Sequence, residues 1–154
     1  MNSDFIRRGG PWVICQAAIL GAVLFSVVFW RNDWKSPLLT ALGAGFLVVA
    51  ALCGIFGATA LGRNLTPLPR PSPNARLVQN GIYGLIRHPL YTAVFCASLG
   101  WALVWGSAPA LAAALVLGFF FDAKARREEH WLRKQFSEYA GYERRVRRFI
   151  PGIY

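Results

Sequence analysis

The stretch that separates the two apolar halves of this chain runs from Asn80 to Tyr91 and has the sequence NGIYGLIRHPLY. It holds one of the two histidines, together with an arginine, two tyrosines and a proline. Polar side chains between membrane segments are unfavourable unless they face water, a partner or a ligand. We therefore expect this stretch to lie at a membrane interface and to form part of a binding site.

Apolar runs on both sides of this stretch predict an all-α, polytopic integral membrane protein with about four transmembrane helices. Hydrophobic residues make up 55% of the 154 residues, and they are bunched into runs long enough for membrane helices. The last two runs are separated by turn-forming residues and should form a helical hairpin. The first run is too long for a typical signal peptide and is expected to be retained. The expected spans are about Pro11–Trp30, Pro37–Leu61, Leu90–Trp105 and Pro109–Phe121.

Two segments outside the spans have compositions of their own. Thr66–Pro73 carries prolines at alternate positions, which excludes a helix and predicts an extended connector. Asp122–Arg148 combines charges with aromatic residues at helical spacing. It predicts an amphipathic cytoplasmic helix that continues from the last span. We divide the chain into a two-helix membrane region, residues 1–61, and a core, residues 62–154.

The net charge is +10, from 17 basic and 7 acidic residues. The charges flank apolar runs, so anionic headgroups explain them better than nucleic acid does. Lysine and arginine are most numerous in the central loop, with four, and in the C-terminal tail, with nine, against two each in the N-terminal tail and the loop between the first two spans. The positive-inside rule therefore favours a cytoplasmic central loop and cytoplasmic termini. We expect an integral protein of a bacterial inner membrane with both termini cytoplasmic. The cysteines Cys15, Cys53 and Cys96 lie in apolar runs without ligand spacing, so no metal site is expected.

The predicted hairpin brings distant polar residues to one end of the molecule. Arg87 and His88 precede the third span, and Glu128 and Glu129 follow the fourth. Because a hairpin returns the chain to the side where it began, these residues can share one pocket at headgroup level. Other interpretations remain open at this point: Arg87 alone is also typical of an interfacial anchor, and the two glutamates are also typical of a solvated helix face.

The same residues carry a resemblance to a known superfamily. The matching elements are spread over Leu61–Pro151, and the spacing of the Arg-His-Pro-x-Tyr motif to the paired glutamates is the specific part. They are Leu61-Gly62-Arg63-Asn64, Leu77-Val78, Gly81-Ile82-Tyr83, Arg87-His88-Pro89-Leu90-Tyr91, Glu128-Glu129, Phe136, Tyr139, Tyr142, Val146 and Ile150-Pro151. In these elements the chain resembles short bacterial members of the isoprenylcysteine carboxyl methyltransferase and phospholipid methyltransferase superfamily.

The resemblance implies an S-adenosylmethionine-dependent methyltransferase whose acceptor is lipophilic, similar to an isoprenylcysteine carboxylate or a phospholipid. It implies that Arg87 and Glu129 are catalytic, with Arg87 orienting an acceptor carboxylate or phosphate. The residues that it assigns to the cofactor pocket are Leu77, Val78, Tyr83, His88, Pro89, Tyr91, Glu128 and Glu129. Ala93 and Ser137 stand where many members carry glycine, and both changes are small.

Two alternatives come from other classes of protein. Membrane reductases of the sterol reductase type share a similar Arg-His-Pro-x-Tyr region and use a nicotinamide cofactor, but they are usually much longer. A non-catalytic membrane protein that uses the pocket only for lipid is the other alternative. The sequence leaves open the methyl acceptor, whether its reacting atom is oxygen, nitrogen or sulfur, and the oligomeric state.

Overall fold

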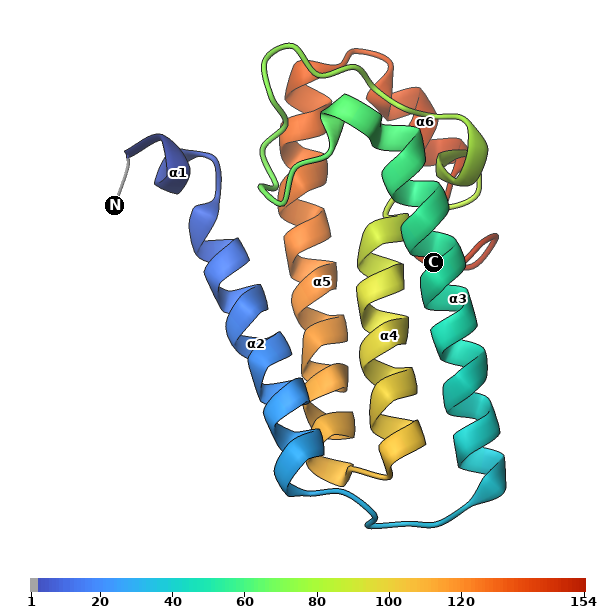
Figure 1. The fold of residues 1–154 in the computed structure, drawn as a ribbon. Coiled ribbons are helices and arrows are strands. Elements are labelled where there is room, and N and C mark those ends of the chain that lie inside the picture. Colours follow the sequence, from blue (N-terminus) through green and yellow to red (C-terminus); the bar gives the residue numbers. More distant parts are fainter. Residues whose placement is uncertain (1–2) are drawn as a thin grey trace.

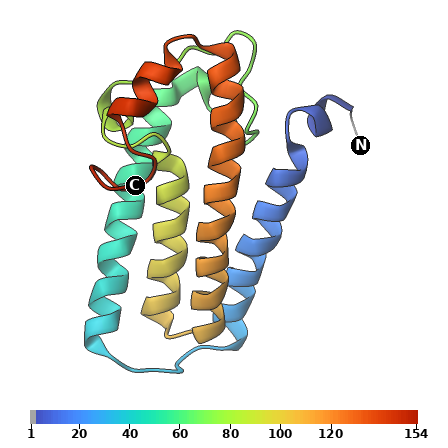
Figure 2. The ribbon, with the colours of Figure 1, turned by 180° about the vertical axis from the view of Figure 1, so that it is seen from behind.

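The computed structural model describes residues 3–154, in which the regular elements are helices and one isolated bridge between Ile86 and Arg147. Four long helices lie side by side in one bundle, and the connector and the C-terminal segment gather at one end of it (Figure 1). The view from behind shows the same arrangement (Figure 2). The helices are α1 (Ser3–Arg7), α2 (Gly10–Phe29), α3 (Pro37–Leu61), η1 (Gly62–Asn64), η2 (Gly81–Gly84), α4 (Pro89–Trp105), α5 (Ala108–Gln135) and α6 (Tyr139–Arg145).

The helical membrane fold predicted from the apolar runs is confirmed. Three of the described helices, α2, α3 and α5, are long and apolar enough to cross a membrane. The fourth helix of the bundle, α4, has 17 residues, or about 26 Å at 1.5 Å per residue, which is short of a typical hydrocarbon core of about 30 Å. The length criterion for a membrane span is therefore met by three helices rather than by all four expected spans.

Helix α4 lies between α3 and α5, and it is the shortest of the four long helices in the bundle. It packs against both α3 and α5, and small side chains such as Ala93, Cys96 and Ala102 are buried along it. Its closest approach is to α3, where a Cβ on Gly100 would lie 2.6 Å from the carbonyl oxygen of Gly43. Small residues allow such close packing where lipid provides no hydrophobic driving force. The large exposed side chains of α2 and α3, such as Phe25 and Phe56, are left to face lipid.

The hairpin between α4 and α5 is closed by the turn residues that predicted it. Gly106 ends α4 in the left-handed region, with φ +63°, which glycine adopts without strain. The Ser107 hydroxyl then caps α5 by accepting a hydrogen bond from the backbone N–H of Ala110 at 3.4 Å. The α2–α3 loop docks on this turn, because Asp33 accepts a hydrogen bond from the N–H of Ala108 at 2.8 Å.

The charged tail differs from the prediction in one respect. Helix α5 does continue from the membrane into charged sequence as far as Gln135, but Phe136 has extended backbone angles and ends it. The predicted single amphipathic helix over Asp122–Arg148 is therefore wrong, since α6 is a separate helix. The break lets Tyr139 and Tyr142 turn back and pack with Leu77, which a straight helix leaving the bundle could not do.

The connector over residues 65–80 contains no helix, as its alternate prolines predict. Its ends and middle are held by hydrogen bonds rather than by regular structure. The Asn64 side chain bonds both backbone groups of Arg76, at 3.2 and 3.3 Å, and Gln135 donates to the carbonyl of Ser72 at 2.8 Å. The connector therefore lies across the end of the bundle as a defined layer.

Candidate functional site

Glu129 is the centre of a buried ion cluster at the connector end of the bundle. Its side chain is fully buried, and its carboxylate lies 2.8 Å from Arg87 Nη2, 3.1 Å from His88 Nε2 and 2.8 Å from Arg148 Nη2. A buried carboxylate needs such partners, because an unpaired charge away from water is strongly unfavourable. We call Glu129, Arg87, His88 and Arg148 the Glu129 cluster.

Arg87 also ties the C-terminal segment to the end of the bundle. Its Nη1 donates hydrogen bonds to the carbonyls of Glu143 at 2.9 Å and Val146 at 2.5 Å. Its backbone N–H donates to the carbonyl of Arg147 at 2.8 Å. An arginine has five N–H donors, and four of them are used by these two carbonyls and by two bonds to Glu129. One N–H of Arg87 is therefore left for a ligand.

Glu128 faces a different environment from its neighbour Glu129. Its carboxylate accepts a hydrogen bond from the hydroxyl of Tyr91. The Tyr91 ring is stacked between His88 and Phe121, with ring centres 5.2 and 4.9 Å apart. Adjacent residues on a helix point in directions about 100° apart, so one glutamate reaches the pocket while the next enters the buried cluster.

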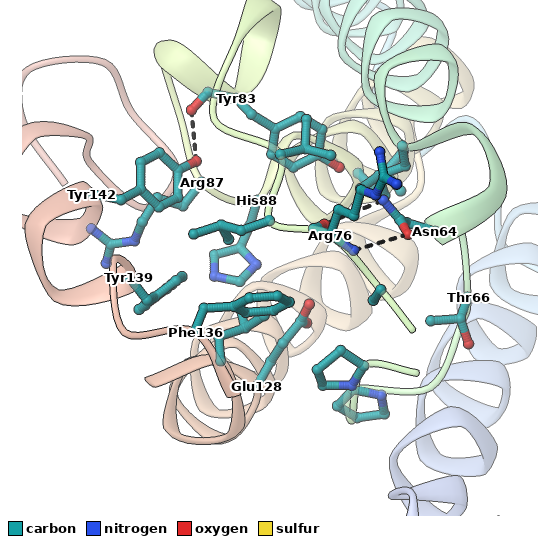
Figure 3. A pocket seen from close by; sticks show the side chains of 18 of the residues that line it. Asn64, Thr66, Arg76, Tyr83, Arg87, His88, Glu128, Phe136, Tyr139 and Tyr142 are labelled. Atoms are coloured by element: carbon teal, nitrogen blue, oxygen red, sulfur yellow. Dashed lines mark hydrogen bonds between the residues drawn. The ribbon is translucent and has the colours of Figure 1, made fainter. Parts of the chain in front are cut away.

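A pocket lies between the ends of α3, α4 and α5, the connector and α6 (Figure 3). Its walls are apolar and aromatic, with a few polar groups that converge on the space, as is typical of small-molecule sites. The connector forms one side through Thr66, Leu68, Pro69 and Pro71. The other lining residues are Leu61, Asn64, Ala75, Arg76, Leu77, Val78, Tyr83, Arg87, His88, Leu90, Tyr91, Glu128, Leu132, Phe136, Tyr139 and Tyr142.

Three buried tyrosines, one from η2 and two from α6, line this pocket. Burial raises the pKa of Tyr142 to about 12, and it also raises the pKa of Tyr83 and Tyr139 above the ordinary value, because a phenolate would lose its hydration. The Tyr142 hydroxyl donates to the carbonyl of Tyr83 at 2.6 Å. The Tyr139 side chain lines the pocket, and its hydroxyl is buried without a hydrogen-bond partner among the described residues.

Most of the residues proposed from the sequence meet in this pocket. Leu77, Val78, Tyr83, Arg87, His88, Tyr91 and Glu128 all line it. Of the residues proposed from the sequence, Glu129 and Pro89 do not line the pocket. Glu129 lies behind the wall in its ion cluster, and Pro89 is buried at the first turn of α4, where it packs beside Gly57.

Sequence reasoning missed the part played by Arg148, which it treated only as one of several arginines suited to headgroups. It also missed Lys124, whose buried ammonium donates to Gln16 Oε1 at 2.5 Å and lies 5.0 Å from the centre of the Tyr91 ring. No spacing or motif distinguishes these two residues from the other basic residues of the tail. The proline-rich connector did carry a signal, since it could not be helical, but its position over the pocket was not predicted.

Within the side chains that the structure describes, no three His, Cys, Asp or Glu residues cluster to hold a metal ion.

Comparison with known proteins identifies the family. The family model for phospholipid methyltransferases matches residues 38–139. The cobalt-zinc-cadmium resistance protein CzcN of Cupriavidus metallidurans is 33% identical over 150 residues, which cover 96% of this chain and 65% of that protein. Protein-S-isoprenylcysteine O-methyltransferase B of Arabidopsis thaliana is 33% identical over 131 residues, 82% of this chain and 66% of that protein. The chain thus spans about two thirds of the length of these relatives.

A solved structure shows the same fold. The eukaryotic intramembrane Ras methyltransferase, an isoprenylcysteine carboxyl methyltransferase, superposes on 99% of this chain and 55% of its own with a TM-score of 0.67 at 21% sequence identity. The match covers the connector, the hairpin and the C-terminal segment as well as the first two helices. The chain therefore belongs to the phospholipid methyltransferase family, within the superfamily that includes the isoprenylcysteine carboxyl methyltransferases.

Proposed function

We propose that this protein is an S-adenosylmethionine-dependent membrane methyltransferase that acts on a lipophilic acceptor. The observation that carries the proposal is the pocket of the matched region, where a carboxylate, stacked aromatic rings and an unpartnered phenol hydroxyl converge. The side chains that line the pocket are of the kinds that bind the chemical groups of this cofactor. Glu128 can attract its ammonium group, Tyr139 can bond a polar group, and aromatic rings such as Tyr91 favour a sulfonium. Leu77 and Val78 offer an apolar wall for the adenine.

Bound in this pocket, S-adenosylmethionine would supply an electrophilic methyl group on a positively charged sulfur. The chain itself would position the reactants, because transfer to a carboxylate acceptor requires no proton removal and depends mainly on alignment. Arg87 lines the pocket and has one N–H without a partner among the described residues, which suits one acceptor oxygen of a carboxylate or phosphate. Leu61 and Leu90, on the membrane side of the pocket, suit the apolar part of a lipophilic acceptor.

Glu129 takes a positioning role in this proposal. Its carboxylate receives bonds from Arg87, His88 and Arg148 and is fully buried behind the pocket wall, so it does not contact an acceptor in the pocket. Its charge holds Arg87 and His88 in the pocket wall. Pro89 supports the same wall by starting α4 immediately after His88.

Calorimetry with the full chain in detergent tests the proposal. We expect S-adenosylhomocysteine to bind and Glu128→Gln to weaken binding by roughly tenfold, which is about 1.4 kcal/mol. The matched control is Glu138→Gln, which removes an exposed carboxylate at the start of α6 and should leave the affinity unchanged. Binding of NADPH without binding of S-adenosylhomocysteine would instead favour a nicotinamide-dependent reductase.

The acceptor class requires a separate experiment. Protein in vesicles is supplied with cofactor carrying a radiolabelled methyl group, and label is followed into extracted phospholipids and into a farnesylated cysteine analogue. We expect label in at least one of these apolar fractions. Binding of S-adenosylhomocysteine without transfer of label to either would contradict a catalytic role for the pocket with these acceptors.

A further inference from the structure

A second hollow lies on the other side of α5, between the start of α2 and the charged half of α5. It is lined by Arg7, Trp12, Arg127 and Trp131, together with Ile6, Gly9 and Pro11. Helix α1 and the charged half of α5 lie at the same end of the bundle in both views (Figures 1 and 2). We propose that this hollow binds the headgroup phosphate of an anionic phospholipid.

The two arginines of the hollow differ from three other basic residues of α5, which have polar partners in the protein. On α5, Lys124 bonds Gln16, Arg126 pairs with Asp122 at 2.7 Å, and Arg133 pairs with Glu143 at 2.6 Å. Among the side chains that the structure describes, residues 5–154, no carboxylate lies within ion-pair distance of Arg7 or Arg127, and the hollow is lined by no acidic residue of that range. Two guanidinium groups from separate helices thus line one hollow, and none of the carboxylates of residues 5–154 pairs with them. A phosphate is the anion that two guanidinium groups bind best.

The position of the hollow along the bundle favours a lipid as the source of this phosphate. Trp12 packs against Phe120, with ring centres 5.5 Å apart, at the end of the apolar part of α5. Arg127 lies about two turns, or roughly 11 Å, further along the helix. This places the guanidinium groups at headgroup level, just outside an apolar surface, where tryptophan rings are enriched.

The walls of the hollow are held in place by packing. The Arg127 guanidinium lies over the Trp131 ring at 4.9 Å, a stack that orients its donors. Gly9 turns the chain into α2 with φ +90°, and a Cβ there would lie 3.2 Å from Trp131 and 3.1 Å from Pro69. The segment before α2 can therefore lie against Trp131 only because this position is glycine.

The test uses the delipidated full chain in detergent and short-chain phosphatidylglycerol as the probe. We expect Arg7→Gln/Arg127→Gln to raise the dissociation constant on the order of tenfold, since each arginine near a membrane surface contributes to anionic lipid binding. The matched control is Arg144→Gln/Arg147→Gln, which removes the same charge from exposed side chains of the C-terminal segment. Its dissociation constant should change much less, because neither Arg144 nor Arg147 lines the hollow. Equal weakening by both double variants would overturn the proposal in favour of general charge attraction.

Two further arms identify the ligand. Phosphatidylcholine of the same chain length should bind much more weakly, and inorganic phosphate should not displace phosphatidylglycerol. Equal binding of phosphatidylcholine, or displacement by inorganic phosphate at similar concentration, would overturn an anionic lipid site.

If the double variant does not fold, Arg127→Lys provides a second test, because it keeps the charge but loses the planar stack on Trp131. An unchanged dissociation constant for this variant would contradict the proposal. Binding of S-adenosylhomocysteine should be unaffected in all these variants, because the hollow is separate from the proposed cofactor pocket.

Discussion

Two adjacent carboxylates on α5, Glu128 and Glu129, experience opposite environments. Glu129 is enclosed by cations from the start of α4 and from the C-terminal segment, whereas Glu128 faces the pocket and accepts one hydrogen bond from Tyr91. A buried charge that loses its partner destabilises the fold, while a pocket charge mainly affects what binds. The two residues should therefore differ in what their substitution changes.

We expect Glu129→Gln to lower the free energy of unfolding by roughly 3–5 kcal/mol, because it leaves the guanidinium groups of Arg87 and Arg148 without their buried anion. Glu128→Gln serves as the matched variant and should change stability by less than about 1 kcal/mol, since the amide oxygen can still accept from Tyr91. Thermal unfolding in detergent measures both. If Glu128→Gln proved the more destabilising of the two, the assignment of Glu129 as the centre of the buried cluster would be wrong.

The hydroxyl groups of Tyr139 and Tyr142 provide a second comparison of neighbouring residues. We expect Tyr139→Phe to leave stability unchanged or slightly raised, because it removes a buried hydroxyl that has no partner in the described residues. Tyr142→Phe should lower stability by roughly 1–3 kcal/mol, since the carbonyl of Tyr83 loses its donor. Under the proposed function, Tyr139→Phe should weaken S-adenosylhomocysteine binding several-fold. A stability loss in Tyr139→Phe comparable with that of Tyr142→Phe would show that its hydroxyl is already satisfied in the folded protein.

At the scale of elements, α3 and α4 approach each other most closely in the half of the bundle away from the pocket. The contact depends on backbone approach at Gly43 and Gly100, where an added methyl group would meet a carbonyl oxygen at less than 3 Å. Gly45 is on the same helix as Gly43, but nothing lies within 4 Å of the Cβ it would carry. Helix α3 thus tolerates an added methyl group at Gly45 but not at Gly43, where it packs against α4.

We expect Gly100→Ala to destabilise the protein by roughly 1–3 kcal/mol, because the helices must separate to admit the methyl group. Gly45→Ala adds the same methyl group on a face with free space and should be neutral or stabilising by up to about 1 kcal/mol. Denaturation in mixed micelles compares the two. Similar stability of both variants would mean that α3 and α4 do not pack as closely as the Gly43–Gly100 contact requires.

For the whole molecule, the bundle places the α2–α3 loop at one end and the connector, α6 and the N-terminal segment at the other (Figure 1). The basic residues of the latter end predict that it faces the cytoplasm. The orientation can be tested with single cysteines in a chain whose Cys15, Cys53 and Cys96 are replaced by alanine. Lys35→Cys marks the loop, and Ser137→Cys marks the pocket end.

In inverted inner-membrane vesicles from a bacterial host, we expect an impermeant maleimide to label Ser137→Cys and not Lys35→Cys. Right-side-out vesicles should give the reverse, because the bundle separates the two positions by the membrane. Detergent-solubilised membranes, in which both positions should react, provide the control for accessibility. Labelling of both cysteines from the same side would contradict this orientation.

The sequence alone determined the four helices of the bundle and their order, because apolar run lengths and the Gly106–Pro109 turn leave few alternatives for a chain in a membrane. The same run lengths predicted that the polar residues before α4 and those late in α5 meet, since a hairpin must return its ends to one side. The end of α5 at Gln135 was not predictable, because the break at Phe136 depends on where Tyr139 and Tyr142 can pack and not on a helix-breaking residue.

Only the tertiary structure decided which of the two glutamates faces the pocket. The sequence places Glu128 and Glu129 side by side, and the rotation of α5 about its axis then turns one to the pocket and the other to the buried cluster. That rotation is set by packing against α2 and α4, which no local pattern encodes. The same is true of Arg148, since a C-terminal arginine becomes the partner of Glu129 only after the chain has folded back over the bundle. The polar stretch from Asn80 to Tyr91 thus marked one wall of the pocket, and long-range packing supplied the others.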